Sequence, residues 1–140
     1  MKKNTSELLS ELEGCSDFRT FYNENSDNLL RRGLSEYLSA LLEEKGLKKA
    51  DVIRRSELSE IYGYQIFSGV RVPERRKLLS LAVGMGLNLE EVQTLLKCSG
   101  YAQLYVKNEF DCIIIFGICK KLSVVEINEL LFDHELDTLG

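Results

Sequence analysis

The chain is poor in residues that interrupt helices or build catalytic centres. Its 140 residues include one proline, one histidine and no tryptophan. A single proline favours long uninterrupted helices. The longest apolar run, CIIIFGIC at 112–119, is far shorter than the roughly 18 residues that a membrane-spanning helix needs. The N-terminus, MKKNTSELLSELEG, has no apolar segment of the kind found in secretory signals. We therefore expect one α-rich domain, located in the cytoplasm and making no membrane contact.

Candidate catalytic and metal-binding groups are also scarce. His134 is the only histidine, and no closely spaced cysteine pair accompanies it to complete a metal site or a nucleophile dyad. Cys112 and Cys119 lie seven residues apart on one face of an expected helix, where cysteine usually serves as a small buried apolar side chain. The GMG at 84–86 lacks the lysine and serine of a phosphate-binding loop and is interpreted as a helix end. We expect no enzymatic activity, no metal and no cofactor.

Charge is distributed unevenly along the chain. The formal net charge is −4. Between Lys45 and Lys77, nine basic and four acidic residues give a local charge of +5, so the remainder carries −9. A positive centre with acidic flanks suits a patch that attracts DNA, and it suits equally a solvated surface whose charges pair internally.

The N-terminal segment combines a short helix with an aromatic stretch. Residues 6–13, SELLSELE, form about two amphipathic turns, with Ser6 as the expected N-cap. The polar stretch that follows is interpreted as a loop. Because Phe18, Phe21 and Tyr22 are too apolar for a free linker, we expect this arm to fold back onto the body of the protein.

Helical periodicity dominates the next 40 residues. Apolar residues at spacings of three and four predict an amphipathic helix from Asn28 to Lys45. A short helix from Lys48 to Arg55, a polar turn at 56–59 and a second helix from Glu60 to Phe67 follow. This second helix is expected to stop at Gly69. Two short helices joined by such a turn can present the second helix to a DNA groove.

The C-terminal half contains an internal repeat. After Pro73, which is expected at the first position of a helix, residues 78–96 align without gaps on residues 113–131, an offset of 35. The register continues from Leu104 to Leu139. Each copy predicts two helices that would bury a shared apolar seam. The second helix of each copy begins with a capping-box pattern: Asn88 with Glu91, and Ser123 with Glu126.

Residues 52–69, VIRRSELSEIYGYQIFSG, resemble the helix-turn-helix of the phage repressor and Cro type. The stretch that follows, VRVPERRKLLSLAVGMGLNLEEV, is similar to the later helices of that family. The matching positions are the opening apolar pair Val52 and Ile53, the turn residues Leu58 and Ser59, the apolar Ile66 and the closing Gly69. The resemblance covers residues 33–97.

This resemblance implies an all-α, lambda-repressor-like five-helix core, and the internal repeat predicts that an additional C-terminal helical hairpin at 104–139 extends it. The expected organisation is an N-terminal helical arm at 1–28 and a single all-helical domain at 29–140. The implied function is that of a bacterial or phage transcription regulator of the Xre family, which binds double-stranded DNA.

The resemblance also assigns the DNA-contacting residues. Base contacts fall on Glu60, Ile61, Tyr64 and Gln65. The amide of Gln65 can pair with adenine, the carboxylate of Glu60 can accept from cytosine, and Ile61 can contact a thymine methyl. Contacts to the phosphates fall on six polar residues: Lys48, Lys49, Ser59, Arg71, Arg75 and Arg76.

A protein-interaction module that uses this fold without DNA is the alternative interpretation. Gly63 stands where the family places an aliphatic residue, and the second helix is unusually aromatic. We expect Tyr62 and Phe67 to be buried in the core and Gly63 to permit a close helix approach, while Tyr64 is exposed. The hairpin at 104–132 could form a homodimer surface under either interpretation.

Overall fold

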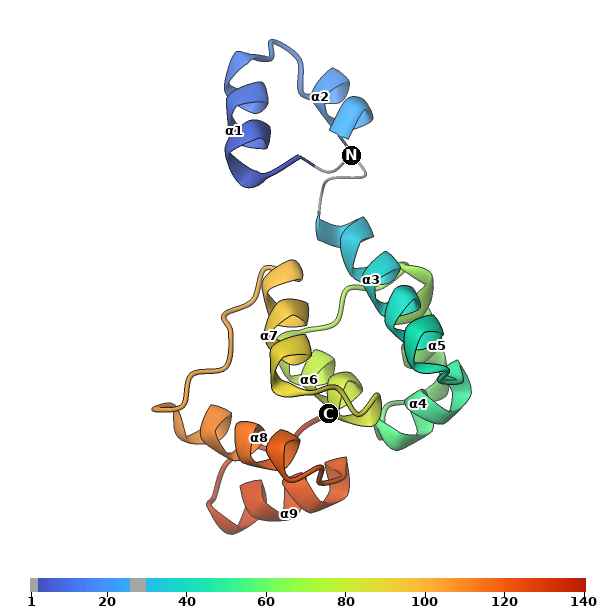
Figure 1. The fold of residues 1–140 in the computed structure, drawn as a ribbon, viewed down its shortest axis with the longest axis vertical. Coiled ribbons are helices and arrows are strands. Elements are labelled where there is room, and N and C mark those ends of the chain that lie inside the picture. The colour runs from blue at the N-terminus through green and yellow to red at the C-terminus, as the bar shows by residue number, and fades with distance from the viewer. Residues whose placement is uncertain (1–2, 26–29) are drawn as a thin grey trace.

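The computed structural model describes residues 3–25 and 30–140. Over those residues the chain forms helices and no strands (Figure 1), which confirms the all-α expectation. No helix in the described part is long and apolar enough to cross a membrane. The helices are α1 (Thr5–Gly14), α2 (Phe18–Asn25), α3 (Leu30–Lys45), α4 (Lys49–Arg55), α5 (Glu60–Ser68), α6 (Arg75–Gly84), α7 (Leu89–Cys98), α8 (Glu109–Cys119) and α9 (Val124–Asp133).

The first helix begins earlier than the sequence predicts. Asn4 is its N-cap, and the Asn4 side chain accepts a hydrogen bond from the Glu7 backbone N–H at 2.8 Å. The predicted cap, Ser6, therefore lies inside α1. The prediction was wrong because asparagine caps a helix at least as well as serine, and Asn4 stands in place to do so.

The stretch predicted as a loop after α1 contains a second helix. The side chain of Asp17 accepts hydrogen bonds from both the backbone and the hydroxyl of Thr20, which starts α2. Phe21 is buried, but Phe18 and Tyr22 are exposed. In Figure 1, α1 and α2 lie apart from the other helices, so the arm does not fold back onto the body as expected.

The amphipathic helix predicted from Asn28 is α3. Asn28 lies outside the described residues, and α3 ends at Lys45 as predicted, followed by Gly46 with a φ of +63°. Leu34, Leu38 and Leu41 are buried. α3 packs against α5 and α7, and α4 packs against α5 and α6, so that these helices enclose one apolar core.

The predicted repeat is present as two helical hairpins, α6–α7 and α8–α9. The second helix of each pair has the same bounds at an offset of 35 residues, and both capping boxes form as predicted. α9 packs against α6, and α8 packs against α7. The first helix of each hairpin therefore packs against the second helix of the other, so the two hairpins are related as if by a twofold axis. In this arrangement the two hairpins bury a shared apolar seam between them.

The helix that follows the proline starts two residues later than predicted. Glu74 is the N-cap of α6, and its backbone carbonyl accepts from the N–H of Leu78. The carbonyl of Pro73 accepts instead from the hydroxyl of Tyr101 at 2.6 Å. Pro73 therefore lies ahead of the helix, because a contact from a distant segment holds its carbonyl.

Candidate nucleic-acid interface

The unit formed by α4, its turn and α5 has local signals at each boundary. At the end of α4, the Ser56 hydroxyl donates to the carbonyl of Val52 at 2.6 Å. The turn passes through Glu57 with a φ of +58°. The Ser59 hydroxyl accepts from the Tyr62 N–H and caps α5, and Gly69 ends α5 with a φ of +82°. The turn bounds agree with the prediction, while α4 begins one residue later and α5 ends one residue later than predicted.

Gly63 lets α5 approach α4 closely. A Cβ at this position would lie only 2.6 Å from a side-chain carbon of Ile53. Phe67 is buried, and Tyr62 is half-buried against the core. The close helix approach at Gly63 and the burial of Phe67 agree with the prediction, whereas Tyr62 was expected to be buried and is only half-buried.

Tyr62 also organises the charged groups at the end of α5. The guanidinium of Arg71 lies 5.5 Å from its ring centroid, and the ammonium of Lys77 lies 5.1 Å from it. Burial, with the nearby carboxylate of Glu74, raises the pKa of Tyr62 above its ordinary value. The ring therefore stays neutral at physiological pH and offers its face to both cations.

The four residues predicted to contact bases share one surface of α5. Ile61 is 75% exposed and Tyr64 is 40% exposed, while Gln65 is half-buried. A shallow groove on this surface is lined by Lys49, Glu60, Ile61, Tyr64, Gln65 and Ser68. Their spacing along α5 places them on one stripe of the helix, directed away from the core.

A second depression adjoins the groove and shares Glu60 and Tyr64 with it. It is lined by Ala50, Ile53, Arg54, Leu58, Glu60 and Tyr64. Its wall from α4 was not predicted from the sequence. Gly63 was the signal for it in the sequence, because a residue without a side chain there allows α4 and α5 to approach closely.

Three of the predicted phosphate-binding cations belong to the start of α4 or to the segment after α5, and two of them, Lys49 and Arg71, contact residues of this surface. Lys49 lines the groove, and its ammonium lies 5.7 Å from the ring centroid of Phe67. Lys48 is exposed at the N-cap of α4. The Nε of Arg71 donates to Oε1 of Gln65 at 2.9 Å, so this cation is held beside the exposed stripe. Ser59, the fourth member of the set on this side, uses its hydroxyl to cap α5.

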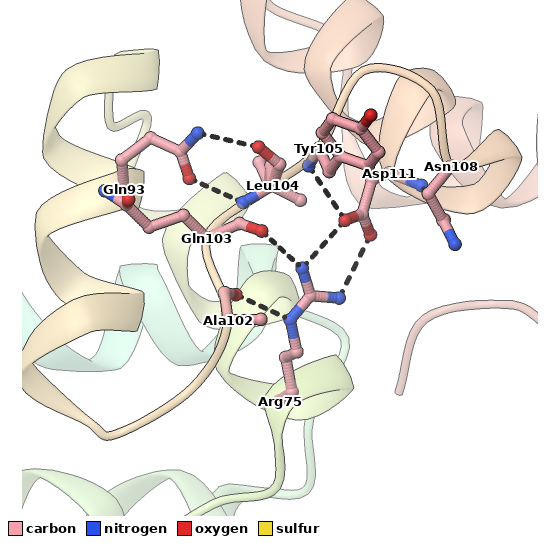
Figure 2. Close-up of polar contacts among 8 residues, drawn as sticks. All are labelled: Arg75, Gln93, Ala102, Gln103, Leu104, Tyr105, Asn108 and Asp111. Carbon is pink, nitrogen blue, oxygen red and sulfur yellow. Dashed lines mark hydrogen bonds and ion pairs between the residues drawn. The ribbon is translucent and has the colours of Figure 1, made fainter.

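Arg75 lies elsewhere and has a different role (Figure 2). Its Nη1 and Nη2 each contact one carboxylate oxygen of the buried Asp111 at 3.0 Å. Its Nε donates to the carbonyl of Ala102 at 3.0 Å, and Nη2 also contacts the carbonyl of Gln103. Asp111 in turn accepts from the Tyr105 N–H. Contrary to the prediction, the guanidinium of Arg75 is committed to joining α6, the connecting segment and α8.

Arg76 also faces the C-terminal hairpin. Its guanidinium lies 5.8 Å from the ring centroid of Phe110 and 3.7 Å from the carboxylate of Asp137. The two arginines follow one another at the start of α6, where both reach toward the second hairpin. Of the six residues predicted to contact phosphates, four belong to α4, the turn or the segment just after α5. The other two, Arg75 and Arg76, belong to α6 and contact the C-terminal segment.

The remaining candidate groups are the single histidine and the two cysteines of α8. His134 is exposed, with its Nδ1 3.9 Å from the Glu109 carboxylate. Among the residues that the structure describes, no group of His, Cys, Asp or Glu could hold a metal ion. Cys112 and Cys119 share one face of α8 as predicted, but both are exposed and not buried. Their face of α8 points away from α9. The prediction that both cysteines are buried was therefore wrong, because residue spacing shows which residues share a face but not which face is covered.

Comparison with protein-family models, with curated proteins and with solved structures gave no match to this chain.

Proposed function

We propose that α4, its turn and α5 form a helix-turn-helix of the phage repressor and Cro type that binds duplex DNA, with α5 in the major groove. In this proposal α3–α7 are the five-helix core of that family. The observation that carries the proposal is the exposed stripe of α5. All four residues assigned to base contact line it, and cations lie at its border. An α-helix with its side chains is about 10–12 Å across, and the major groove is about 12 Å wide, so α5 fits it.

Each residue of the stripe has a role that its chemistry supports. Gln65 contacts the edge of an adenine, Glu60 accepts from a cytosine, and the exposed Ile61 and Tyr64 contact thymine methyls or the sugar edge. Arg71 already holds the Gln65 side chain by a hydrogen bond. Less side-chain entropy is then lost when Gln65 meets its base.

The phosphate contacts in the proposal are fewer than the sequence suggested. Lys48, Lys49 and Arg71 supply the cations, and Arg75 is excluded because it is bound to Asp111. Three cations for each chain predict a modest electrostatic contribution, with a log–log salt slope of about −3. Glu60 lies on the same surface and lowers the non-specific affinity further.

A protein partner is the second candidate for the same surface. Ile61 is 75% exposed, and Tyr64 lines both hollows, whose walls are mainly apolar. A partner helix with one apolar anchor in each hollow would fit this shape. In that case affinity would come from apolar burial and would depend little on salt.

Two matched variants test the DNA proposal. Arg71→Ala should weaken binding to every duplex and reduce the salt slope by about 1. Arg76→Ala removes another exposed cation from the same region of sequence, whose guanidinium reaches Phe110 and Asp137 of the C-terminal segment, and should leave duplex affinity unchanged. Fluorescence anisotropy with a labelled duplex measures both. Equal losses in the two variants would show that the contact is not made by α5.

Adding a cation to the stripe separates the two candidates. Ile61→Arg places a positive charge beside Gln65 and removes the apolar anchor. It should strengthen non-specific duplex binding at low salt, because one more phosphate is neutralised. For a protein partner held by apolar contacts, the same change should abolish binding. Weaker duplex binding by a folded Ile61→Arg chain would contradict the DNA proposal.

A further inference from the structure

The outer face of α8 is apolar and uncovered. Phe116 is 49% exposed, and Cys112 and Cys119 are exposed on the same stripe. Residues at 112, 116 and 119 are spaced by four and three, so they lie in one line along the helix. The stripe has an acid at one end and a base at the other: Glu109 in the first turn and Lys120 at the C-cap.

In the first copy of the repeat, the corresponding face of α6 is buried. At an offset of 35 residues, Phe116 and Cys119 correspond to Leu81 and Gly84 of α6. Leu81 is fully buried. Gly84 lies against α4 so closely that a Cβ there would approach the carbonyl of Val52 to 2.9 Å. In the first hairpin α4 covers this face, whereas in the second the corresponding face is exposed.

The partner helix α9 cannot cover the stripe, because it packs on the opposite side of α8. Ile114 and Gly117 are buried there. A Cβ at Gly117 would lie 2.5 Å from a side-chain carbon of Ile127 in α9, so the two helices are already in close contact on that side. Any occupant of the stripe must therefore come from outside the hairpin.

The arrangement of charges on the stripe identifies the occupant. If a second α8 packs antiparallel across it around a twofold axis, Glu109 lies opposite the second copy's Lys120, and Lys120 lies opposite the second copy's Glu109. In the same register each Phe116 lies opposite the second copy's Ile113. The stripe is therefore complementary to itself in both charge and apolar character, as an isologous interface requires.

We propose that the chain forms a homodimer through the outer faces of two antiparallel α8 helices. The α8 helix has 11 residues and is about 16 Å long, so the contact is at the small end of protein interfaces. The dimer is therefore weak and depends on concentration. In the monomer, Glu109 also lies near His134, at 3.9 Å, and the Lys120 ammonium lies 6.0 Å from the Phe116 ring centroid. The dimer forms without DNA, so this proposal stands apart from the function proposed above.

Sedimentation velocity of the full chain over a dilution series is the first test. The wild type should change from dimer to monomer on dilution, and Phe116→Asp should be monomeric throughout. Phe132→Asp is the matched control, because Phe132 is an aromatic of α9 that is 75% exposed and lies off the stripe. It should retain the wild-type dimer. A wild type that is monomeric at every concentration, or a dimer that survives Phe116→Asp, would overturn the proposal.

Charge reversal tests the antiparallel register. Glu109→Lys alone and Lys120→Glu alone each place like charges opposite one another at both ends of the stripe, and each should weaken the dimer. The double variant, with both reversals, restores two opposite-charge pairs and should regain most of the wild-type affinity. Far-ultraviolet circular dichroism confirms that each variant is folded. A double variant weaker than both single variants would contradict this register.

Thiol labelling followed by mass spectrometry gives an independent readout. Cys112 and Cys119 should react more slowly with iodoacetamide in concentrated than in dilute protein, because the dimer covers their stripe. Cys15, in the N-terminal arm, serves as the internal control and should react at the same rate in both. Protection of Cys15 alone would place the contact on the arm and contradict the α8 interface.

Discussion

The two hairpins α6–α7 and α8–α9 share their local geometry but differ in what surrounds them. In each, the second helix starts with a capping box, and an amide side chain binds the backbone of a residue further along the chain. Gln93 exchanges two hydrogen bonds with Leu104, and Asn128 accepts one from Leu139 at the equivalent place. The first hairpin is enclosed by α3 and α4, while the second lies at the edge of the body (Figure 1).

The repeated sequence determines the local structure of each hairpin, whereas the neighbouring helices determine which of its faces are buried. Caps and backbone hydrogen bonds are satisfied within each hairpin, so they are the same in both copies. Burial of the outer face depends on a third element. α4 supplies it for Leu81, whereas Phe116, its equivalent, has no such cover among the described residues. The same face of the repeat is therefore part of the core in α6 and is exposed to solvent in α8.

The largest expected difference between the hairpins is in their apolar outer faces. Leu81→Ala should lower the free energy of unfolding by about 3 kcal/mol, because it leaves a cavity under α4. Phe116→Ala should lower it by less than about 1 kcal/mol, because half of the ring is already in water. Urea unfolding of dilute, monomeric protein measures both. Similar losses at the two positions would contradict the difference in cover.

The ion pair that joins the hairpins should have the next largest effect. Asp111→Ala leaves the guanidinium of Arg75 without its carboxylate and should cost about 2 kcal/mol. This is less than for a fully buried pair, because the Arg75 side chain is 26% exposed. Hydrogen exchange should quicken first in α8 and α9. Exchange that quickens equally in α3 and α4 would show that the hairpin does not open separately.

The two capping boxes should contribute equally to the free energy of unfolding, although their surroundings differ. Asn88→Ala and Ser123→Ala each remove the side chain that accepts from the third helical N–H, at 2.8 Å and 3.1 Å respectively. Each should cost about 1 kcal/mol in urea unfolding. A difference of more than about 1 kcal/mol between them would mean that the caps respond to tertiary surroundings after all.

The smallest expected effect is a pH dependence at Glu91. Burial alone would raise the pKa of this carboxyl, but the hydrogen bond from the Asn88 N–H and the nearby Lys45 ammonium outweigh it, and the pKa is lowered below 4.5. The Lys45 ammonium lies 3.0 Å from the carboxylate. The resulting stabilisation is present at neutral pH and is lost as the pH falls below 4.5 through the folded-state pKa.

Glu91→Gln should therefore destabilise the chain at pH 7 by under about 1 kcal/mol, and the difference from wild type should shrink in acid. Thermal unfolding between neutral and acidic pH measures this trend. Glu126→Gln is the matched control, because Glu126 holds the same place in the second capping box and has no ion pair in the part of the chain that is described. If the stability difference between wild type and Glu91→Gln grew in acid, the ionised carboxylate of Glu91 would not be the stabilising form.

Features set by neighbouring residues were predictable from the sequence. Helix α5 is bounded by Ser59 and Gly69, which act through a side-chain cap and a left-handed backbone, and both were placed correctly. The 35-residue repeat and its capping boxes were likewise visible, because both depend on residues a few positions apart. The cap at Asn4 and the start of α2 beside Asp17 rest on equally local hydrogen bonds.

Features set by distant contacts could not be predicted. The two cysteines of α8 share a helix face, but only the position of α9 decides that this face is exposed. Arg75 belongs to the basic centre of the sequence, yet Asp111, 36 residues away, neutralises it. Pro73 was misplaced because Tyr101 holds its carbonyl outside the helix. Each depends on chain segments that a local pattern does not bring together.

The salt dependence of duplex binding tests the central claim most directly. Anisotropy of a labelled random-sequence duplex, titrated with the wild-type chain at several salt concentrations, gives the affinity and its log–log slope. The proposed interface of Lys48, Lys49 and Arg71 predicts measurable binding at low salt and a slope of about −3 for each chain bound. A folded chain that binds no duplex at low salt would contradict the assignment of α5 as a DNA-reading helix.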